Sequence, residues 1–316
     1  MRVLVTGGGG PGSEMLWKLW KDKHSIYFAD QDISRIYPGI PRIQRAEVPP
    51  GIDPLFISKV IAVTKDLTID LIISQVDEEL VALKENEKAL APAIVIAPPL
   101  IFIKMFLDKL NAGQSLASNE IHEPDTQLLT EKSKLDSCPL LVKPRIGRGS
   151  RDLFIAKSDR EFEKLKEYLL TRNEDFIVQE LKLGIEYSVQ MLANSKGELK
   201  AIIPVKINAK RGSTTSGKVE NNRSVIDTCL KFHSKYSPTG TYNIQLILSE
   251  IDGIAFIFEV NPRVSTTMCL GLFGGADPIE SYFDIQSKGP FKTVEDGLEL
   301  QRFWVNSIYP KVSIQE

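Results

Sequence analysis

Three oxygen-bearing side chains toward the C-terminal end of the sequence have the types and the spacing of a metal site. In the run AFIFEVNPR (255–263), strand alternation puts Glu259 and Asn261 on one face and the two phenylalanines on the other. A three-residue turn that ends at Gly253, in the left-handed conformation, would place Gln245 directly opposite Glu259. One carboxylate and two amide carbonyls suit Mg²⁺, which takes its remaining ligands from water and substrate phosphates. The alternative is three solvated strand residues, which the apolar strands around them disfavour.

A second group of residues suits a phosphate. In LLVKPRIGRGSRD (140–152), Lys143 ends an apolar strand and opens a turn that contains Gly147 and Gly149. A lysine at this place can put a point charge on phosphate oxygens, and small residues let the backbone close over them. The pattern differs from the G-x-x-x-x-G-K-[ST] phosphate loop. The alternative to a phosphate site is a basic turn on a hairpin.

A third stretch, FIVQELKLGIEYSV (176–189), has the features of a nucleoside site. The strand end formed by Gln179, Glu180 and Leu181 can offer backbone N–H and C=O groups to an adenine edge. Glu186 follows closely and supplies a carboxylate for ribose hydroxyls. The pattern is not specific by itself, because strands of this kind are common.

The N-terminal run VLVTGGGGPGSE also resembles a nucleotide-binding signature. Gly7, Gly9 and Gly12 satisfy G-x-G-x-x-G, and Asp30 follows at the end of a second apolar run. A dinucleotide site and a plain tight turn both explain the glycines. Pro11 favours the turn, because it removes one N–H from a loop that would have to present N–H groups to a pyrophosphate.

The elements that must position these residues fall into two patterns. Over residues 1–98, strands that are apolar throughout alternate with amphipathic helices, which predicts a parallel sheet covered on both faces. The remainder predicts an α+β region with a helix capped by Ser158, antiparallel strands, and a polar loop over 210–222. The residues beyond 290 have no readable pattern.

Composition limits the functions that remain open. The 316 residues carry a formal net charge of −2, so no global field attracts nucleic acid or an anionic membrane. No apolar run approaches the roughly 18 residues of a membrane span. The three cysteines are far apart (Cys138, Cys229 and Cys269), which favours a reducing, cytoplasmic environment.

Taken in order, these motifs resemble the ATP-grasp superfamily. The resemblance rests on Lys109 in LDK, on Lys143, on the QEL stretch, and on the Gln245 to NPRVS ending. It is closest to a single synthetase unit of the carbamoyl phosphate synthetase large subunit. The resemblance implies an α/β protein: a Rossmann-like pre-ATP-grasp domain over 1–98, then an ATP-grasp domain. Its small subdomain with a lid would span 99–182, and its C-terminal subdomain with the metal site would span 183–316.

The resemblance also implies roles for individual residues. ATP and Mg²⁺ (or Mn²⁺) would bind in the cleft, with Lys143 and Arg263 acting on the transferred phosphoryl group. The implied nucleotide-binding residues are Lys109, Lys143, Gly147, Gly149, Ser150, Gln179, Glu180, Leu181 and Glu186. The implied metal ligands are Gln245, Glu259 and Asn261. Residues 145–150 match a mobile lid, which we expect to order when ATP binds. The N-terminal glycine loop would then lie beside the acceptor side of the cleft, without a nicotinamide.

The predicted activity is an ATP- and Mg²⁺-dependent carboxylate–amine ligase that acts through an acyl phosphate. The partners would be small-molecule carboxylates and amines, with no nucleic acid or membrane, and a homodimer stays open. The chain has a single ATP-grasp unit, and KRGSTTSGK (210–218) stands where the family has its bicarbonate-side sequence; both departures disfavour carbamoyl phosphate synthesis. A carboxylate or carbamate kinase and a non-catalytic nucleotide-binding protein are the alternatives.

Overall fold

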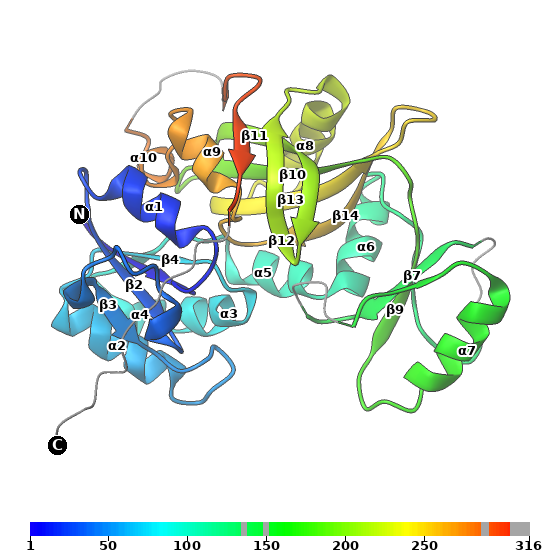
Figure 1. The fold of residues 1–316 in the computed structure, drawn as a ribbon, viewed down its shortest axis with the longest axis horizontal. Helices are drawn as coiled ribbons and strands as arrows, with labels where there is room; N and C mark the ends of the chain where they lie inside the picture. Colours follow the sequence, from blue (N-terminus) through cyan, green and yellow to red (C-terminus); the bar gives the residue numbers. More distant parts are fainter. Residues whose placement is uncertain (134–137, 148–151, 286–290, 304–316) are drawn as a thin grey trace.

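The fold contains three sheets that follow one another along the chain (Figure 1). The computed structural model describes residues 1–133, 138–147, 152–285 and 291–303. Each sheet lies within one of the three segments that the sequence predicts as structural units, although the division itself stays a prediction.

The N-terminal sheet has five strands in the order β3-β2-β1-β4-β5, and every neighbouring pair is parallel. The strands are β1 (Arg2–Thr6), β2 (Ser25–Asp30), β3 (Arg45–Glu47), β4 (Leu71–Ser74) and β5 (Ile94–Val95). The helical elements between them are α1 (Ser13–Trp20), η1 (Ile33–Arg35), η2 (Arg42–Gln44), α2 (Phe56–Asp66), α3 (Asp77–Glu85) and α4 (Glu87–Leu90). Helix α1 covers one face and α2 and α3 cover the other, so the strands are apolar on both sides. The prediction of a covered parallel sheet is confirmed.

The second sheet has four antiparallel strands and forms a separate lobe at the right of Figure 1. Helices α5 (Leu100–Leu107) and α6 (Lys109–Ser118) lead into it. The sheet consists of β6 (Thr126–Leu128), β9 (Phe176–Glu180), β7 (Leu140–Pro144) and β8 (Phe154–Ala156), with α7 (Asp159–Leu169) packed on it. The predicted cap is confirmed, because the Ser158 hydroxyl accepts a hydrogen bond from the Glu161 N–H.

The third sheet has seven strands, with the path β14-β13-β10-β11-β12-β16 and β15 paired to β11. Its strands are β10 (Ile185–Ala193), β11 (Leu199–Arg211), β12 (Ser213–Val219), β13 (Gly240–Leu248), β14 (Ala255–Asn261), β15 (Lys292–Thr293) and β16 (Glu299–Gln301). Its helices are α8 (Arg223–Tyr236), α9 (Met268–Phe273) and α10 (Pro278–Tyr282). The predicted polar loop over 210–222 is wrong for most of its length: β11 runs to Arg211 and pairs with β12 as a hairpin. Strand β16 pairs with β12 and supports this hairpin from its other side.

One hydrophobic core joins the first sheet to the third. Val3 and Phe28 of the parallel sheet lie in the same cluster as Ile203 of β11 and Met268 of α9, all of them fully buried. Trp20, also fully buried, donates its indole N–H to the Asp277 carboxylate at 2.8 Å. The glycine loop that follows β1 is therefore held close to the third sheet. In the part of the chain that the structure describes, no helix is long and apolar enough to cross a membrane.

Candidate active site

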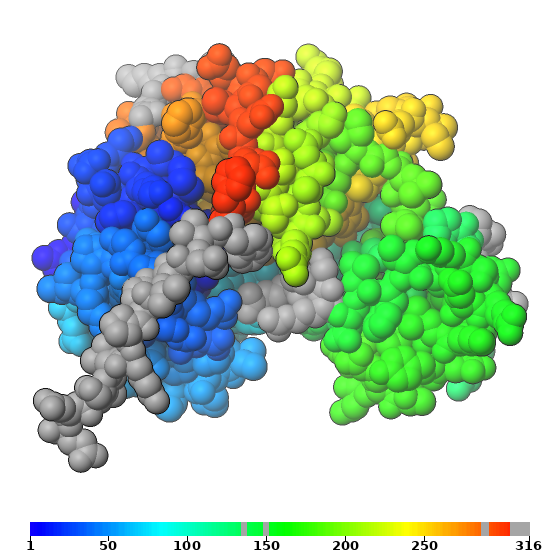
Figure 2. Space-filling model, in the orientation of Figure 1, coloured from blue at the N-terminus to red at the C-terminus, as the bar shows by residue number. Residues whose placement is uncertain are grey.

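The largest concentration of predicted site residues lines a cleft of about 470 Å³ between the four-stranded and the seven-stranded sheets. We call it the large cleft. In Figure 2 the lobe of the four-stranded sheet stands apart from the N-terminal region, so the molecule is hollowed between them. The predicted residues that line the cleft are Lys109, Lys143, Gly147, Gln179, Glu180, Leu181, Glu186, Gln245 and Glu259. The other predicted lid residues, Gly149 and Ser150, lie outside the described residues, and so does half of the expected lid, residues 148–150.

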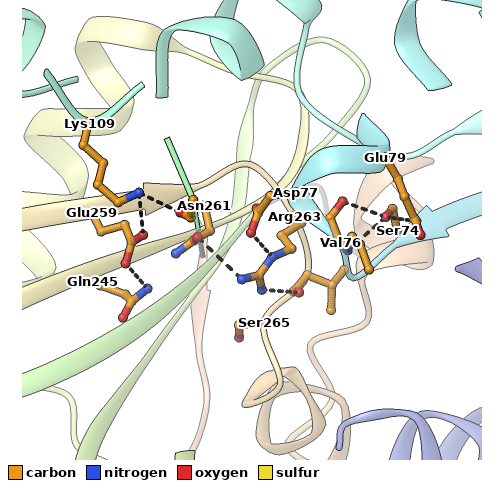
Figure 3. A network of polar contacts seen from close by, with 12 residues as sticks. Ser74, Val76, Asp77, Glu79, Lys109, Gln245, Glu259, Asn261, Arg263 and Ser265 are labelled. Carbon is orange, nitrogen blue, oxygen red and sulfur yellow. Dashed lines mark hydrogen bonds and ion pairs between the residues drawn. The ribbon is translucent and has the colours of Figure 1, made fainter. Parts of the chain in front are cut away.

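The hairpin of β13 and β14 brings Gln245 and Glu259 together as predicted, but by a different route. Gln245 pairs with Glu259, and the Gln245 amide donates to the Glu259 carboxylate at 3.0 Å (Figure 3). The turn is not the predicted three-residue loop: Ser249 pairs with Ile254, which leaves four residues between them. Gly253 has the predicted positive φ, at +70°.

A β-bulge restores the pairing that the longer turn would have shifted. Leu246 pairs with Ile257 and Gln245 with Glu259, so Phe258 is the extra residue. The strict alternation predicted for this strand is therefore wrong. Ile257 is buried in the core, whereas Phe258 lines the large cleft beside Glu259.

Lysine side chains surround the Glu259 carboxylate. The Lys109 ammonium lies 4.0 Å from Glu259 and donates to the Gly147 carbonyl at 2.6 Å. Lys143 is buried, and its ammonium lies 5.6 Å from the centre of the Phe258 ring. Burial lowers the pKa of Lys143 to about 8; Glu259 opposes this shift, and the neighbouring charges of Lys109 and Lys210 add to it. An anion placed among these lysines would relieve their mutual repulsion.

The far end of the large cleft is formed by the end of β9. The N–H groups of Glu180 and Leu181 already donate to the carbonyls of Asp125 and Pro139, at 2.9 and 3.3 Å. These two N–H groups are therefore already used within the protein, although both residues line the large cleft. Burial raises the pKa of the nearby Glu123 carboxyl to about 7.

The predicted ribose ligand, Glu186, forms an ion pair with Lys210 at 2.7 Å. Lys210 lies near the tip of the β11–β12 hairpin and lines the large cleft. The sequence does not indicate Lys210 as a site residue, because the segment that follows it has the composition of a loop. The only sequence signal was the basic start of the stretch, KRG.

A smaller pocket of about 130 Å³, the middle pocket, continues from Glu259 to Asn261 and Arg263. Arg263 donates to the Asp77 carboxylate at 3.0 Å and lies 3.5 Å from the Asn261 amide oxygen (Figure 3). Burial raises the pKa of Asp77, and the adjacent Arg263 charge opposes that shift. The pair connects the start of α3 to the end of β14.

The donor set of the predicted metal site fits a hard cation. Glu259 supplies a carboxylate at the cleft surface, while the amide nitrogen of Asn261 is buried without a partner among the described residues. Rotation of the Gln245 amide would turn its oxygen toward the Glu259 carboxylate, and the Asn261 amide oxygen already accepts a hydrogen bond from Arg263 at 3.5 Å. Among the described residues there is no group of three or more His, Cys, Asp or Glu that could hold a metal. An ion held here would thus need oxygen ligands from its substrate.

The N-terminal glycines line a third cavity of about 490 Å³, the glycine-loop cavity, which shares Arg263 and Thr266 with the middle pocket. The N–H groups of Gly8, Gly9 and Gly10 are used within the protein. Gly8 donates to the Ala29 carbonyl at 2.8 Å, and Gly9 donates to the Asp30 carboxylate at 2.7 Å. Asp30 therefore fixes the loop itself, which agrees with a tight turn rather than a pyrophosphate cradle.

Comparison with protein families gives one match, to an ATP-grasp domain, over residues 106–267. The chain belongs to the ATP-grasp family. The matched region contains the large cleft and the predicted metal ligands, and the match confirms the predicted ATP-grasp ligase at the level of family and fold. No curated protein matches the sequence.

Solved structures with a similar fold come from ligases and carboxylases. A carboxyaminoimidazole ribonucleotide synthase from Aspergillus clavatus, complexed with ATP, has 15% identity and a TM-score of 0.70, with 93% of this chain and 79% of that chain covered. An L-amino acid ligase from Bacillus licheniformis has 15% identity and a TM-score of 0.63, with 85% and 68% covered. A biotin carboxylase from Campylobacter jejuni has 14% identity and a TM-score of 0.67, with 90% and 70% covered. At these identities the likeness concerns the fold.

Proposed function

We propose that the chain is an ATP- and Mg²⁺-dependent carboxylate–amine ligase that activates its carboxylate substrate as an acyl phosphate. The observation that carries the proposal is the row of three cavities. The large cleft is lined by those of the predicted nucleotide residues that the structure describes, and the middle pocket and the glycine-loop cavity continue from it past Arg263. Membership of the ATP-grasp family and the C–N ligases among the similar folds support it.

In this proposal the large cleft binds ATP. The adenine would lie at the end of β9, and the phosphates would lie among Lys109, Lys143 and Lys210. Two of these lysines, Lys109 and Lys143, have no ion pair closer than 4.0 Å among the described residues, so their charge is available to an anion. Gln245, Glu259 and Asn261 would hold the metal, which supplies positive charge at the phosphate oxygens when it is bound.

The remaining substrates would bind in the middle pocket and the glycine-loop cavity, which we together call the acceptor side. An oxygen of the carboxylate attacks the γ-phosphorus of ATP; the bond to the β-phosphate oxygen breaks, and ADP leaves. Arg263, at the junction of the two cavities, would neutralise charge on the transferred phosphoryl group. The amine nitrogen then attacks the acyl carbon, loses a proton, and phosphate leaves as the C–N bond forms.

A cytoplasmic location belongs to the same proposal. ATP is the proposed substrate, and Cys138, Cys229 and Cys269 are free thiols. Free thiols persist in a reducing compartment.

A phosphate-release screen with ATP, Mg²⁺ and pooled carboxylates and amines tests the proposal. We expect ADP and phosphate to form only when a carboxylate and an amine are both present, and the Lys143→Met variant to be inactive. ADP formation with a carboxylate alone, together with an acyl phosphate that hydroxylamine traps, would instead support the carboxylate kinase. A protein that binds ATP and consumes none with any pool would contradict both and leave a nucleotide-binding protein.

A further inference from the structure

Arg302, one residue after β16, connects three segments that are far apart in the sequence. Its Nε donates to the Thr214 carbonyl at 2.9 Å, its Nη2 to the Thr266 carbonyl at 2.5 Å, and its Nη1 to the Pro11 carbonyl. Its own backbone is fixed, because its N–H donates to the Thr215 carbonyl at 2.8 Å. One side chain therefore joins the glycine loop, strand β12 and the segment that follows the proposed metal ligands.

All three of these segments border the acceptor side. Thr214 and Thr266 line the middle pocket, and Pro11 and Thr266 line the glycine-loop cavity. None of the three residues lines the large cleft. Arg302 thus lies behind the walls of the cavities assigned to the carboxylate and the amine, and none of its side chain's hydrogen-bond partners lines the large cleft.

The glycine loop and the Thr266 segment are also in direct contact. A Cβ atom on Gly12 would lie 3.0 Å from the Gln75 amide oxygen and 3.5 Å from the Thr266 Cα. A methyl group at position 12 would thus be in van der Waals contact with the Thr266 segment, and the Gln75 side chain would have to shift by a few tenths of an ångström. The relative position of the two segments therefore sets the shape of the junction between the two cavities.

The partners of Arg302 are neutral carbonyl groups. Among the residues that the structure describes, no carboxylate lies within ion-pair distance of its guanidinium. A guanidinium carries five N–H donors in a rigid planar fork, which can hold several acceptors at fixed angles. Lysine has one ammonium and cannot reach three separate carbonyls with the same geometry.

We propose that Arg302 is a positioning residue that fixes the walls of the acceptor side and so controls the binding of the non-nucleotide substrates, without a part in ATP binding. The use of these cavities by substrates rests on the proposed function. The connection between the three segments does not.

Hydrogen exchange of the free protein tests the connection itself. In Arg302→Met we expect faster exchange in peptides that cover 7–16, 213–219 and 262–270, with unchanged exchange in 140–147 and 176–182. Arg302→Lys should give a smaller effect in the same peptides. Arg223→Met is the matched control, because Arg223 is exposed and, among the residues that the structure describes, forms an ion pair only with Asp227 on its own helix. Unchanged exchange, or a uniform increase over the whole chain, would overturn the inference.

Steady-state kinetics test the consequence for binding, with a carboxylate and an amine found in the phosphate-release screen. In Arg302→Met we expect the KM of these substrates to rise about 10- to 100-fold, while the KM of ATP stays within about twofold. An equal rise for ATP, or unchanged KM values, would contradict the positioning role. If Arg302→Met does not fold, Arg302→Lys carries both measurements. If the screen finds no substrate, the proposed function fails, and hydrogen exchange still decides whether Arg302 holds the three segments.

Discussion

The pKa of Lys143 makes ATP binding depend on pH in a way that can be calculated. Burial lowers this pKa from 10.5 to about 8 in the free protein. Only the charged ammonium attracts phosphate, so binding requires the protonated form. At pH 7 roughly nine tenths of the free protein carries the proton, and at pH 9 roughly one tenth does. The affinity for an ATP analogue should therefore fall about tenfold between pH 7 and pH 9.

Titration calorimetry with a non-hydrolysable ATP analogue measures this dependence. Above pH 8 the binding should take up a proton, which is detected by repeating the titration in buffers with different ionisation enthalpies. Lys143→Met should bind more weakly and lose the fall in affinity, which separates this effect from the titration of the nucleotide. Lys109→Met should bind more weakly and keep the fall. An affinity that is constant from pH 7 to pH 9, or a fall that persists in Lys143→Met, would refute the reasoning.

The same pKa predicts the stability of the empty protein. Because the pKa of Lys143 is lower in the folded chain, unfolding takes up a proton between pH 8 and 10.5, and stability rises with pH over that range. Below pH 8 the buried charge costs about 3 kcal/mol relative to an unshifted lysine. Lys143→Met should therefore be more stable than the wild type at pH 7, by up to about 3 kcal/mol in urea unfolding. A less stable variant would show that the ammonium contributes to folding.

Three further predictions concern the metal site, the nucleotide and the core. Glu259→Ala should abolish Mg²⁺-dependent turnover and leave the circular dichroism spectrum unchanged; near-normal ATP consumption would remove Glu259 from the site. Calorimetry should detect ATP binding and no NAD binding, because the glycine-loop N–H groups, such as that of Gly9, are bonded within the protein; tight NAD binding without ATP binding would reverse the assignment. Trp20→Phe should lower the free energy of unfolding by about 1 to 3 kcal/mol, because Asp277 loses a buried hydrogen bond, and a change below about 0.5 kcal/mol would contradict this.

Local signals in the sequence predicted much of the fold. The apolar strands of the first hundred residues, the Ser158 cap and the partners Gln245 and Glu259 depend on neighbours along the chain or on a short hairpin. The error at 210–222 has a different cause. Serine, threonine and glycine are typical of loops, and this stretch forms a strand through pairing on both sides, with β11 in a hairpin and with β16, which lies about eighty residues later.

The candidate site was predictable where its residues lie at the ends of regular elements. The β-bulge at Phe258 could not be predicted from the sequence. Its position depends on which of Ile257 and Phe258 packs into the core, and both side chains are apolar. Lys210 and Arg302 belong to segments without a motif, and only the three-dimensional arrangement brings them to the cavities.

The core that joins the first and third sheets has a consequence for how the chain can be divided. A fragment that began at residue 99 would leave Ile203 and Met268 facing water, and it would remove Asp77 from beside Arg263. Such a fragment would contain the whole matched family region and still lack the residues of the first sheet that complete this core. The two sheets are therefore one cooperative unit and should melt in a single transition. A domain from another protein could replace one of them only if the core residues of the other sheet changed to match.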